Sequence, residues 1–291
     1  GITYISGTNI NFANTAEAEI IFPKKMEFSN PQYFTTPFIS ASLFGRHRVA
    51  SAAALNFNWI GASNDYGFQA YFIKTAEESK DGRFLLTSRK GDFSIFTDVY
   101  DNQKWNLAVR VKDGKYPYAA GLTGSDDSNN VTIEFTGYNV ELGVVRNSFA
   151  VSASGLNDLN LSPGVRYYAG ADRENYVGTT ATRTDVRVSS VRHYAHYLED
   201  SALLAHAKDP TNFGVERPNR NIIFSTNKES LSIDNLDLPE YASLAFHWDF
   251  SQVTGTDTDG AFQVNDASSG SVSLQDRYSS NGNFSYIVAN Q

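Results

Sequence analysis

Two carboxylates near the amino end of the chain have a spacing that sugar chemistry could use. Glu17 and Glu19 stand at alternate positions, so on a strand both would project from one face, as the paired acids of a glycosidase do around the bond they cleave. Ile20, Ile21 and Phe22 follow without a third acid, and no Glu-x-Asp-x-x-Glu arrangement occurs. We therefore predict solvated charges at a sheet edge and no enzyme, with glycoside hydrolysis kept as a remote alternative.

The five histidines do not form a reactive or metal-binding set. His193 and His196 are three residues apart, and residues with that spacing point to opposite faces of a strand. His47, His206 and His247 are scattered, and no Gly-x-Ser-x-Gly motif supplies a nucleophile for them. The chain has no cysteine, which excludes disulfides and thiolate chemistry. We predict packed or surface histidines.

Two acidic turns could hold calcium, a cation that prefers carboxylate, amide and carbonyl oxygens. The first contains Asp126 and Asp127, and the second contains Asp257 and Asp259. Neither has the spacing of a helix-loop-helix calcium site, and Asp, Asn and Gly favour turns for reasons of their own. These four residues are the metal candidates, and we otherwise predict that the chain needs no cofactor.

Exposed aromatic rings beside amides or carboxylates would bind a sugar by stacking and directional hydrogen bonds. Tyr116 and Tyr118 are one candidate group, and Asp172, Asn175 and Tyr176 are a second. The chain has 16 Tyr and 20 Phe, so some rings must lie outside the core. A structural role is therefore favoured over sugar binding, and both interpretations stay open.

Strict alternation of apolar and polar residues predicts the strands that carry these side chains. In residues 105–111 a tryptophan, a leucine and two valines face one way, which predicts a strand with one buried and one solvated face. It runs into Asp113-Gly114, which predicts a tight hairpin because both residues tolerate positive φ. The same alternation recurs at residues 55–59, 131–135 and 244–250.

One segment, residues 201–208, has the signals of a helix. Glu199 and Asp200 stand at the positive end of the helix dipole, Lys208 stands at the negative end, and Pro210 prevents continuation. Many short strands with one late helix predict an all-β sandwich or jelly roll rather than alternating strands and helices.

Charge and hydropathy exclude two classes of partner. The net charge is −8 and no Lys/Arg cluster occurs, which argues against a nucleic-acid-binding surface. No apolar run approaches the roughly 20 residues of a membrane helix, so we predict no membrane insertion. The 291 residues suffice for one large sandwich and extra material. The first residue is Gly1 rather than Met, which we interpret as a sign of processing or of a longer parent chain.

Two stretches carry a family resemblance. The run WNLAV at residues 105–109 resembles the Trp-x-x-Ala-Val strand of laminin-G-like and concanavalin A-like modules. The run SVRHY at residues 190–194, then Leu198 and the helix from Ser201, is similar to the ending of such modules, with Ser190 in place of the usual acid. The resemblance implies a concanavalin A-like (laminin-G-like) jelly-roll sandwich with one short helix near residues 201–208.

Four phrases narrow the resemblance to large virion structural proteins of tailed, often marine, bacteriophages. They are EIIFPKK at residues 19–25, SLFG at 42–45, VYDN at 99–102 and AHAKDPTNFG at 205–214. The resemblance spans most of residues 15–275 and implies that laminin-G-like modules of this kind are parts of longer chains. It implies a place on the virion surface, with other virion proteins or copies of the chain itself as partners.

The carboxyl-terminal segment looks like the opening of another module, because LAFHWDF at residues 244–250 follows a polar stretch at 219–241. We predict a laminin-G-like sandwich at residues 1–214, a linker at 215–242 and a β-rich segment at 243–291. Roughly 50 residues cannot bury a self-sufficient sandwich, so we expect this segment to complete a sheet elsewhere, in this chain or in a neighbour.

Two functions follow from these patterns. The first is a virion structural, decoration or adhesion protein of a tailed bacteriophage that acts through assembly contacts and weak binding to host surface glycans. The alternative is an extracellular carbohydrate-binding lectin module, with calcium as an optional structural ion.

Overall fold

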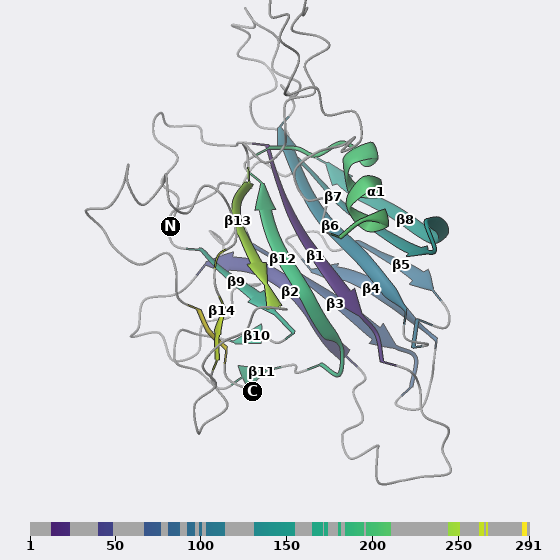
Figure 1. Cartoon of the computed structure of the whole chain (residues 1–291), viewed down its shortest axis with the longest axis horizontal. Coiled ribbons are helices and arrows are strands. Elements are labelled where there is room, and N and C mark those ends of the chain that lie inside the picture. The colour runs from purple at the N-terminus through teal and green to yellow at the C-terminus, as the bar shows by residue number, and fades with distance from the viewer. Residues whose placement is uncertain are drawn as a thin grey trace, which may run out of the picture.

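Two antiparallel sheets stacked face to face make up the body of the protein (Figure 1). The computed structural model describes residues 13–23, 40–48, 67–76, 81–87, 92–96, 99–100, 103–113, 131–154, 165–170, 172–173, 180–181, 184–194, 196–210, 244–250, 262–264, 266 and 287–289. The chain therefore has the all-β, concanavalin A-like jelly-roll sandwich that its sequence predicts.

The first layer is a six-stranded sheet in which every pair of neighbours is antiparallel. Its strands, in spatial order, are β13 (Leu244–Asp249), β12 (Arg187–Tyr194), β1 (Asn14–Ile21), β6 (Lys104–Asp113), β7 (Val131–Glu141) and β8 (Val144–Ser154). Strands β1 and β12, which are far apart in the sequence, are thus direct neighbours within this layer.

The second layer is a five-stranded antiparallel sheet. Its strands, in spatial order, are β5 (Asp92–Phe96), β4 (Gly82–Thr87), β3 (Phe68–Lys74), β2 (Ser40–Arg48) and β9 (Val165–Ala169). Two small two-stranded sheets pair β10 (Asp172–Arg173) with β11 (Thr180–Ala181) and β14 (Phe262–Val264) with β15 (Ile287–Ala289).

Aromatic rings fill the space between the two large sheets. Phe84 of β4 lies at the centre, with its ring centroid 5.0 Å from that of Phe149, 5.1 Å from Trp105 and 5.2 Å from Phe72. All four side chains are buried, and such pairs add to the burial of apolar area through their edge-to-face and offset arrangements. This aromatic cluster holds the two layers together.

A second, smaller core lies on the opposite face of the six-stranded sheet, beneath the helix α1 (Asp200–Lys208). Figure 1 shows α1 lying over β6 and β7, outside the sandwich. The helix buries Leu203, His206 and Ala207. Within the described residues, no helix has the length and apolar character needed to cross a membrane.

This second core corrects the expectation that the strands have one solvated face. Asn106, Ala108 and Arg110 of β6 are as buried as the apolar residues between them, at 3% exposure or less. Glu17 and Glu19, expected to be solvated edge charges, are 1% and 6% exposed on the central strand β1. The alternation reports the polarity of each face correctly, but the polar face is covered by α1 and the segment before it.

The prediction of a tight hairpin at Asp113-Gly114 is also wrong. The strand that pairs with β6 begins at Val131, which lies opposite Asp113. Burial of Ile133 and Phe135 opposite β6 sets the register here, and this outweighs a local turn preference. The tight turn lies instead between β7 and β8, where Leu142 and Gly143 have φ of 50° and 78°. Positive φ at both central residues matches the twist of a two-residue hairpin.

The carboxyl-terminal segment contributes β13, which pairs with β12 at one edge of the six-stranded sheet. A bulge at this pairing puts Leu244 in the core beneath α1, whereas Phe246 and Trp248 face the core between the sheets. This segment therefore completes a sheet of the same chain through β13. The boundaries of the sandwich, the linker and the last segment stay predictions, and residues 211–243 lie outside the described residues.

The packing around Gly137 of β7 allows no side chain. A Cβ at this position would overlap the Phe149 ring and come within 2.9 Å of Leu107. We expect Gly137→Ala to lower the free energy of unfolding by about 1–3 kcal/mol through overpacking. Gly143 has open space around it, so Gly143→Asn should cost little because Asn tolerates positive φ. Urea unfolding of both variants tests this, and an equal loss at the two positions would contradict the steric argument.

Candidate functional site

The polar residues that alternate along β1 and β6 meet polar residues of β12, β7 and α1 in a layer between the six-stranded sheet and the helix. They include two acids, two arginines and a histidine that are each at least half-buried. These residues, which we call the outer polar layer, are Thr15, Glu17, Asn106, Arg110, Glu134, Thr136, Arg192 and His206.

A buried acid and histidine form one half of this layer. His206 Nδ1 lies 3.0 Å and 3.1 Å from the two carboxylate oxygens of Glu17, and the two side chains are 0% and 1% exposed. Asn106 Nδ2 donates to the same carboxylate at 2.6 Å, and Arg192 Nη1 lies 3.6 Å from it. The carboxylate thus has partners from three elements, α1, β6 and β12.

These partners decide the protonation state of Glu17. Burial by itself would raise the pKa of this carboxyl, but the charge and hydrogen bond of His206, the charge of Arg192 and the Asn106 amide lower it from 4.5 to about 2. Burial and the charge of Arg192 lower the pKa of the nearby His247 to about 4, although Asp249 and Glu17 oppose this shift. Near neutral pH, Glu17 is therefore ionised and His247 is neutral.

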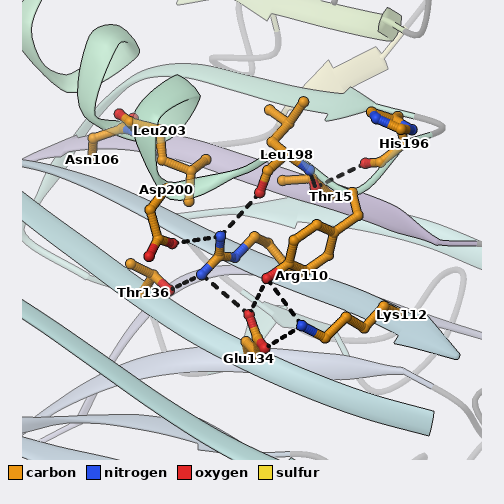
Figure 2. Close-up of polar contacts among 11 residues, drawn as sticks. Thr15, Asn106, Arg110, Lys112, Glu134, Thr136, His196, Leu198, Asp200 and Leu203 are labelled. Atoms are coloured by element: carbon orange, nitrogen blue, oxygen red, sulfur yellow. Dashed lines mark hydrogen bonds and ion pairs between the residues drawn. The ribbon is translucent and has the colours of Figure 1, made fainter. Parts of the chain in front are cut away.

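Arg110 organises the other half of the layer (Figure 2). Its Nη1 lies 2.6 Å from Asp200 Oδ1 in the first turn of α1 and donates to the Leu198 carbonyl at 3.0 Å. Its Nη2 donates to Thr136 Oγ1 and lies 3.1 Å from Glu134 Oε2. Because the guanidinium is planar and has several donors, it binds the first turn of α1 and the side chains of β7 simultaneously.

The segment before the helix is fixed in the same place. Thr15 Oγ1 donates to the His196 carbonyl and accepts from the Leu198 amide, both at 2.9 Å. The Tyr197 hydroxyl donates to Glu134, and the centroid of its ring lies 4.9 Å from the Arg110 cation and 4.6 Å from the Lys112 cation. Burial and the bond to Glu134 raise the pKa of Tyr197, which therefore stays a hydrogen-bond donor.

A histidine held by an acid is the arrangement that general-base catalysis uses, but here it lacks access. A catalytic histidine must come within hydrogen-bond reach of a substrate, directly or through a water. His206 is 0% exposed on the face of α1 that packs against the sheet, with the Tyr194 ring stacked 5.8 Å away. In this position the pair can hold the helix onto the sheet, and it has no surface to offer to a substrate.

One further buried charge lies between the two large sheets. Arg46 of β2 is 3% exposed, and Nη1 donates to Asn14 Oδ1 at 2.9 Å and to the Tyr167 hydroxyl at 3.5 Å. Its guanidinium also lies 5.5 Å from the centroid of the Phe68 ring. Both hydrogen-bond partners are neutral, in contrast to the acids around Arg110. Burial and the charge of Arg46 lower the pKa of His193 well below its usual range, so this histidine is neutral.

The candidate residues named from the sequence lie mostly outside the described part of the chain. Asp172 is in β10 and pairs through its backbone with Ala181. The sugar candidates and metal candidates outside the described residues are Tyr116, Tyr118, Asn175, Tyr176, Asp126, Asp127, Asp257 and Asp259. Among the described residues, no group of three His, Asp or Glu side chains could hold a metal ion. His193 is buried and His196 is exposed, so these two do not share a site.

The sequence analysis missed the Glu17–His206 pair because the two residues are 189 positions apart. A usable signal does exist. Polar residues alternate on both β1 and β6, and the helix at residues 200–208 carries a histidine on its apolar face.

No protein-family model and no curated protein matches the sequence significantly. Among solved structures, the marine PL-14 alginate lyase from Aplysia kurodai is 12% identical, with a TM-score of 0.30, covering 63% of this chain and 68% of the lyase. Scytalido-glutamic peptidase, solved with a peptide-based transition state analog, is 10% identical, with a TM-score of 0.28, covering 65% and 78%. At these TM-scores the likenesses carry no inference about activity.

The two buried arginines should respond differently to removal of their charge. Arg110→Met takes the guanidinium from Glu134, which keeps Lys112 and Tyr197, and removes the donor to the Leu198 carbonyl and the Thr136 hydroxyl. We expect a loss of about 2 kcal/mol in the free energy of unfolding. Arg46→Met strands only neutral groups, so we expect no loss, or a gain of about 1 kcal/mol. Denaturant unfolding of both variants is the measurement. Equal losses would mean that Arg46 has a counter-charge beyond its neutral partners.

Acid should destabilise the protein in two steps. His247 titrates at about 4 in the folded chain and 6.5 when unfolded, so stability falls as the pH drops from 6.5 to 4. The ionised Glu17 carboxylate makes its full contribution to the free energy of unfolding, roughly 3 kcal/mol, above pH 4.5. This contribution disappears as the pH falls to about 2.

Glu17→Gln should therefore be less stable than the wild type at pH 7, and this difference should shrink below pH 4.5. Thermal unfolding across pH measures this, and the exposed Glu141→Gln, which should follow the wild-type curve, is the control.

Proposed function

We propose that this chain is a structural, decoration or adhesion module on the virion surface of a tailed bacteriophage. It acts through assembly contacts with other virion proteins or with copies of itself, and through at most weak binding to host surface glycans. In this proposal the chain catalyses no reaction, needs no cofactor and inserts into no membrane. The virion-like phrases of the sequence and the use of its charged residues support this reading.

The observation that carries the proposal is the enclosure of the outer polar layer. The residue types that an active centre would need, an acid, a histidine and two arginines, are 4% exposed or less and bind α1 to the sheet. Chemistry needs such groups at a surface that a substrate can reach. Groups committed to holding two elements in register are typical of a rigid building block.

Four measurements test the proposal. A map of the intact particle should contain symmetric copies of this sandwich, and a glycan array probed with the purified chain should give no specific signal. Tyr176→Ala and Tyr176→Phe serve as a matched pair on the array, because only the Phe variant keeps the ring that would stack on a sugar. Binding that is lost in Tyr176→Ala and kept in Tyr176→Phe would support the lectin function instead.

The two remaining tests concern calcium and catalysis. The melting temperature of the chain should be no higher in calcium than in EDTA, and incubation with polysaccharides should yield no cleavage.

A further inference from the structure

Strand β8 forms one edge of the six-stranded sheet (Figure 1). Ten of its eleven residues pair with β7 on one side, and among the strands of the described part of the chain none pairs with its other side. Most of its side chains are exposed, and Phe149 alone is buried. A strand in this position presents a row of backbone donors and acceptors to any chain that can reach it.

The usual protections of an edge strand are confined to one end of β8. Arg146 lies at a bulge in the pairing with β7, and its charge is matched by Glu141 at 2.9 Å. The following eight residues, 147–154, contain no charge, no proline and no glycine. Charges, prolines and bulges are the devices that keep edges from pairing, and the sequence of residues 147–154 contains none of them.

The apolar surface of the described residues points to the same place. The large apolar side chains exposed there, Leu142, Val144 and Val145, all lie in the β7–β8 hairpin and its turn. Along the regular part of β8, Val151 and Ala153 face the core between the sheets but are only half-buried. Val151 and Ala153 are therefore covered only in part, and a further strand at this edge would cover them more fully.

We propose that β8 pairs antiparallel with β8 of a second copy of this chain, about a two-fold axis near Ala150. The two six-stranded sheets then become one continuous sheet. An axis perpendicular to the sheet keeps the core-facing residues of both copies on one face. Phe149 of each copy then lies opposite Val151 of the other. The hairpin tips lie at the two ends of the paired region.

A second copy fits this edge better than a charged partner does. Each chain carries a net charge of −8, which favours approach through a neutral surface, and residues 147–154 are such a surface. Pairing about Ala150 places no like charges opposite each other, and a strongly charged peptide would find no complementary charge there.

The association should be weak for two isolated chains. A strand pair of this length buries well under the roughly 1,600 Å² of a standard stable interface. Many copies fixed on one particle would raise the effective concentration of each for its neighbour. The biological meaning of the pairing rests on the proposed virion role, but the pairing itself is tested in solution. If the chain does not pair in solution, the proposed virion role is unaffected. If the chain is absent from particles, the pairing in solution can still be observed.

A disulfide trap tests the pairing directly, because the chain has no cysteine of its own. In the proposed register Ala150 lies opposite its own copy, with Cα atoms about 5 Å apart, within the range that a disulfide spans. We expect Ala150→Cys to form covalent dimers rapidly under mild oxidation. Two copies of Ser154 are about 26 Å apart in the same register, so Ser154→Cys should stay monomeric.

Two controls make the outcome decisive. Ala76→Cys places a cysteine at another exposed alanine, far from β8 in the sequence, and it measures cross-linking by random collision. Cross-linking of Ala150→Cys at no more than this rate would overturn the proposal. Equal cross-linking of Ala150→Cys and Ser154→Cys would also overturn it, since that result indicates parallel or unspecific association.

A charge placed on the axis gives an independent measurement. Sedimentation equilibrium of the wild type, from roughly 10 μM to 1 mM, should show a rising average mass, as expected for a small interface. Ala150→Lys brings two lysines face to face and should weaken association about tenfold or more, whereas Ala76→Lys should match the wild type. A wild type that stays monomeric throughout, or an Ala150→Lys variant that associates equally well, would contradict the pairing.

Discussion

A carboxylate that the fold removes from water is the constraint on which the outer layer of the molecule depends. Glu17 is 1% exposed on a strand with sheet neighbours on both sides, so groups from other elements must compensate its charge. His206 of α1, Arg192 of β12 and Asn106 of β6 do so. The nine-residue helix is too short to be stable by itself, and leaving the sheet would strand this buried charge. The helix is therefore held in one position by electrostatics as well as by packing.

The two faces of the six-stranded sheet are stabilised by different kinds of interaction. Between the sheets, rings around Phe84 interlock, and their burial is largely non-directional. Beneath α1 the contacts are hydrogen bonds and ion pairs, such as those of Arg110 with Asp200 and Leu198, which require particular atoms to meet. The inner face thus supplies most of the apolar burial. The outer face defines where the helix and its leading segment lie along the sheet.

The sequence predicts what local periodicity can encode and misses what depends on distant partners. The alternation in β6 and the charged and proline signals around α1 predict a strand and a helix that the structure contains. They do not reveal that Glu17 is buried, because alternation reports the polarity of a face and not what covers it. The hairpin expected at Asp113-Gly114 fails for a related reason: residues buried far along the chain set the register. The Glu17–His206 pair joins residues 189 positions apart, a separation that no short motif spans.

The two edges of the six-stranded sheet differ in a way that bears on how the chain assembles. At the β13 edge, the Asp266 carboxylate accepts the His247 amide at 2.9 Å, and Asp266 also forms a bridge with Trp248. At the β8 edge, residues 147–154 have no comparable cover among the described residues. A sheet with two open edges can add copies without end, whereas a sheet with one open edge can join only one partner by a two-fold axis. The asymmetry of the edges therefore favours a closed pair over a filament.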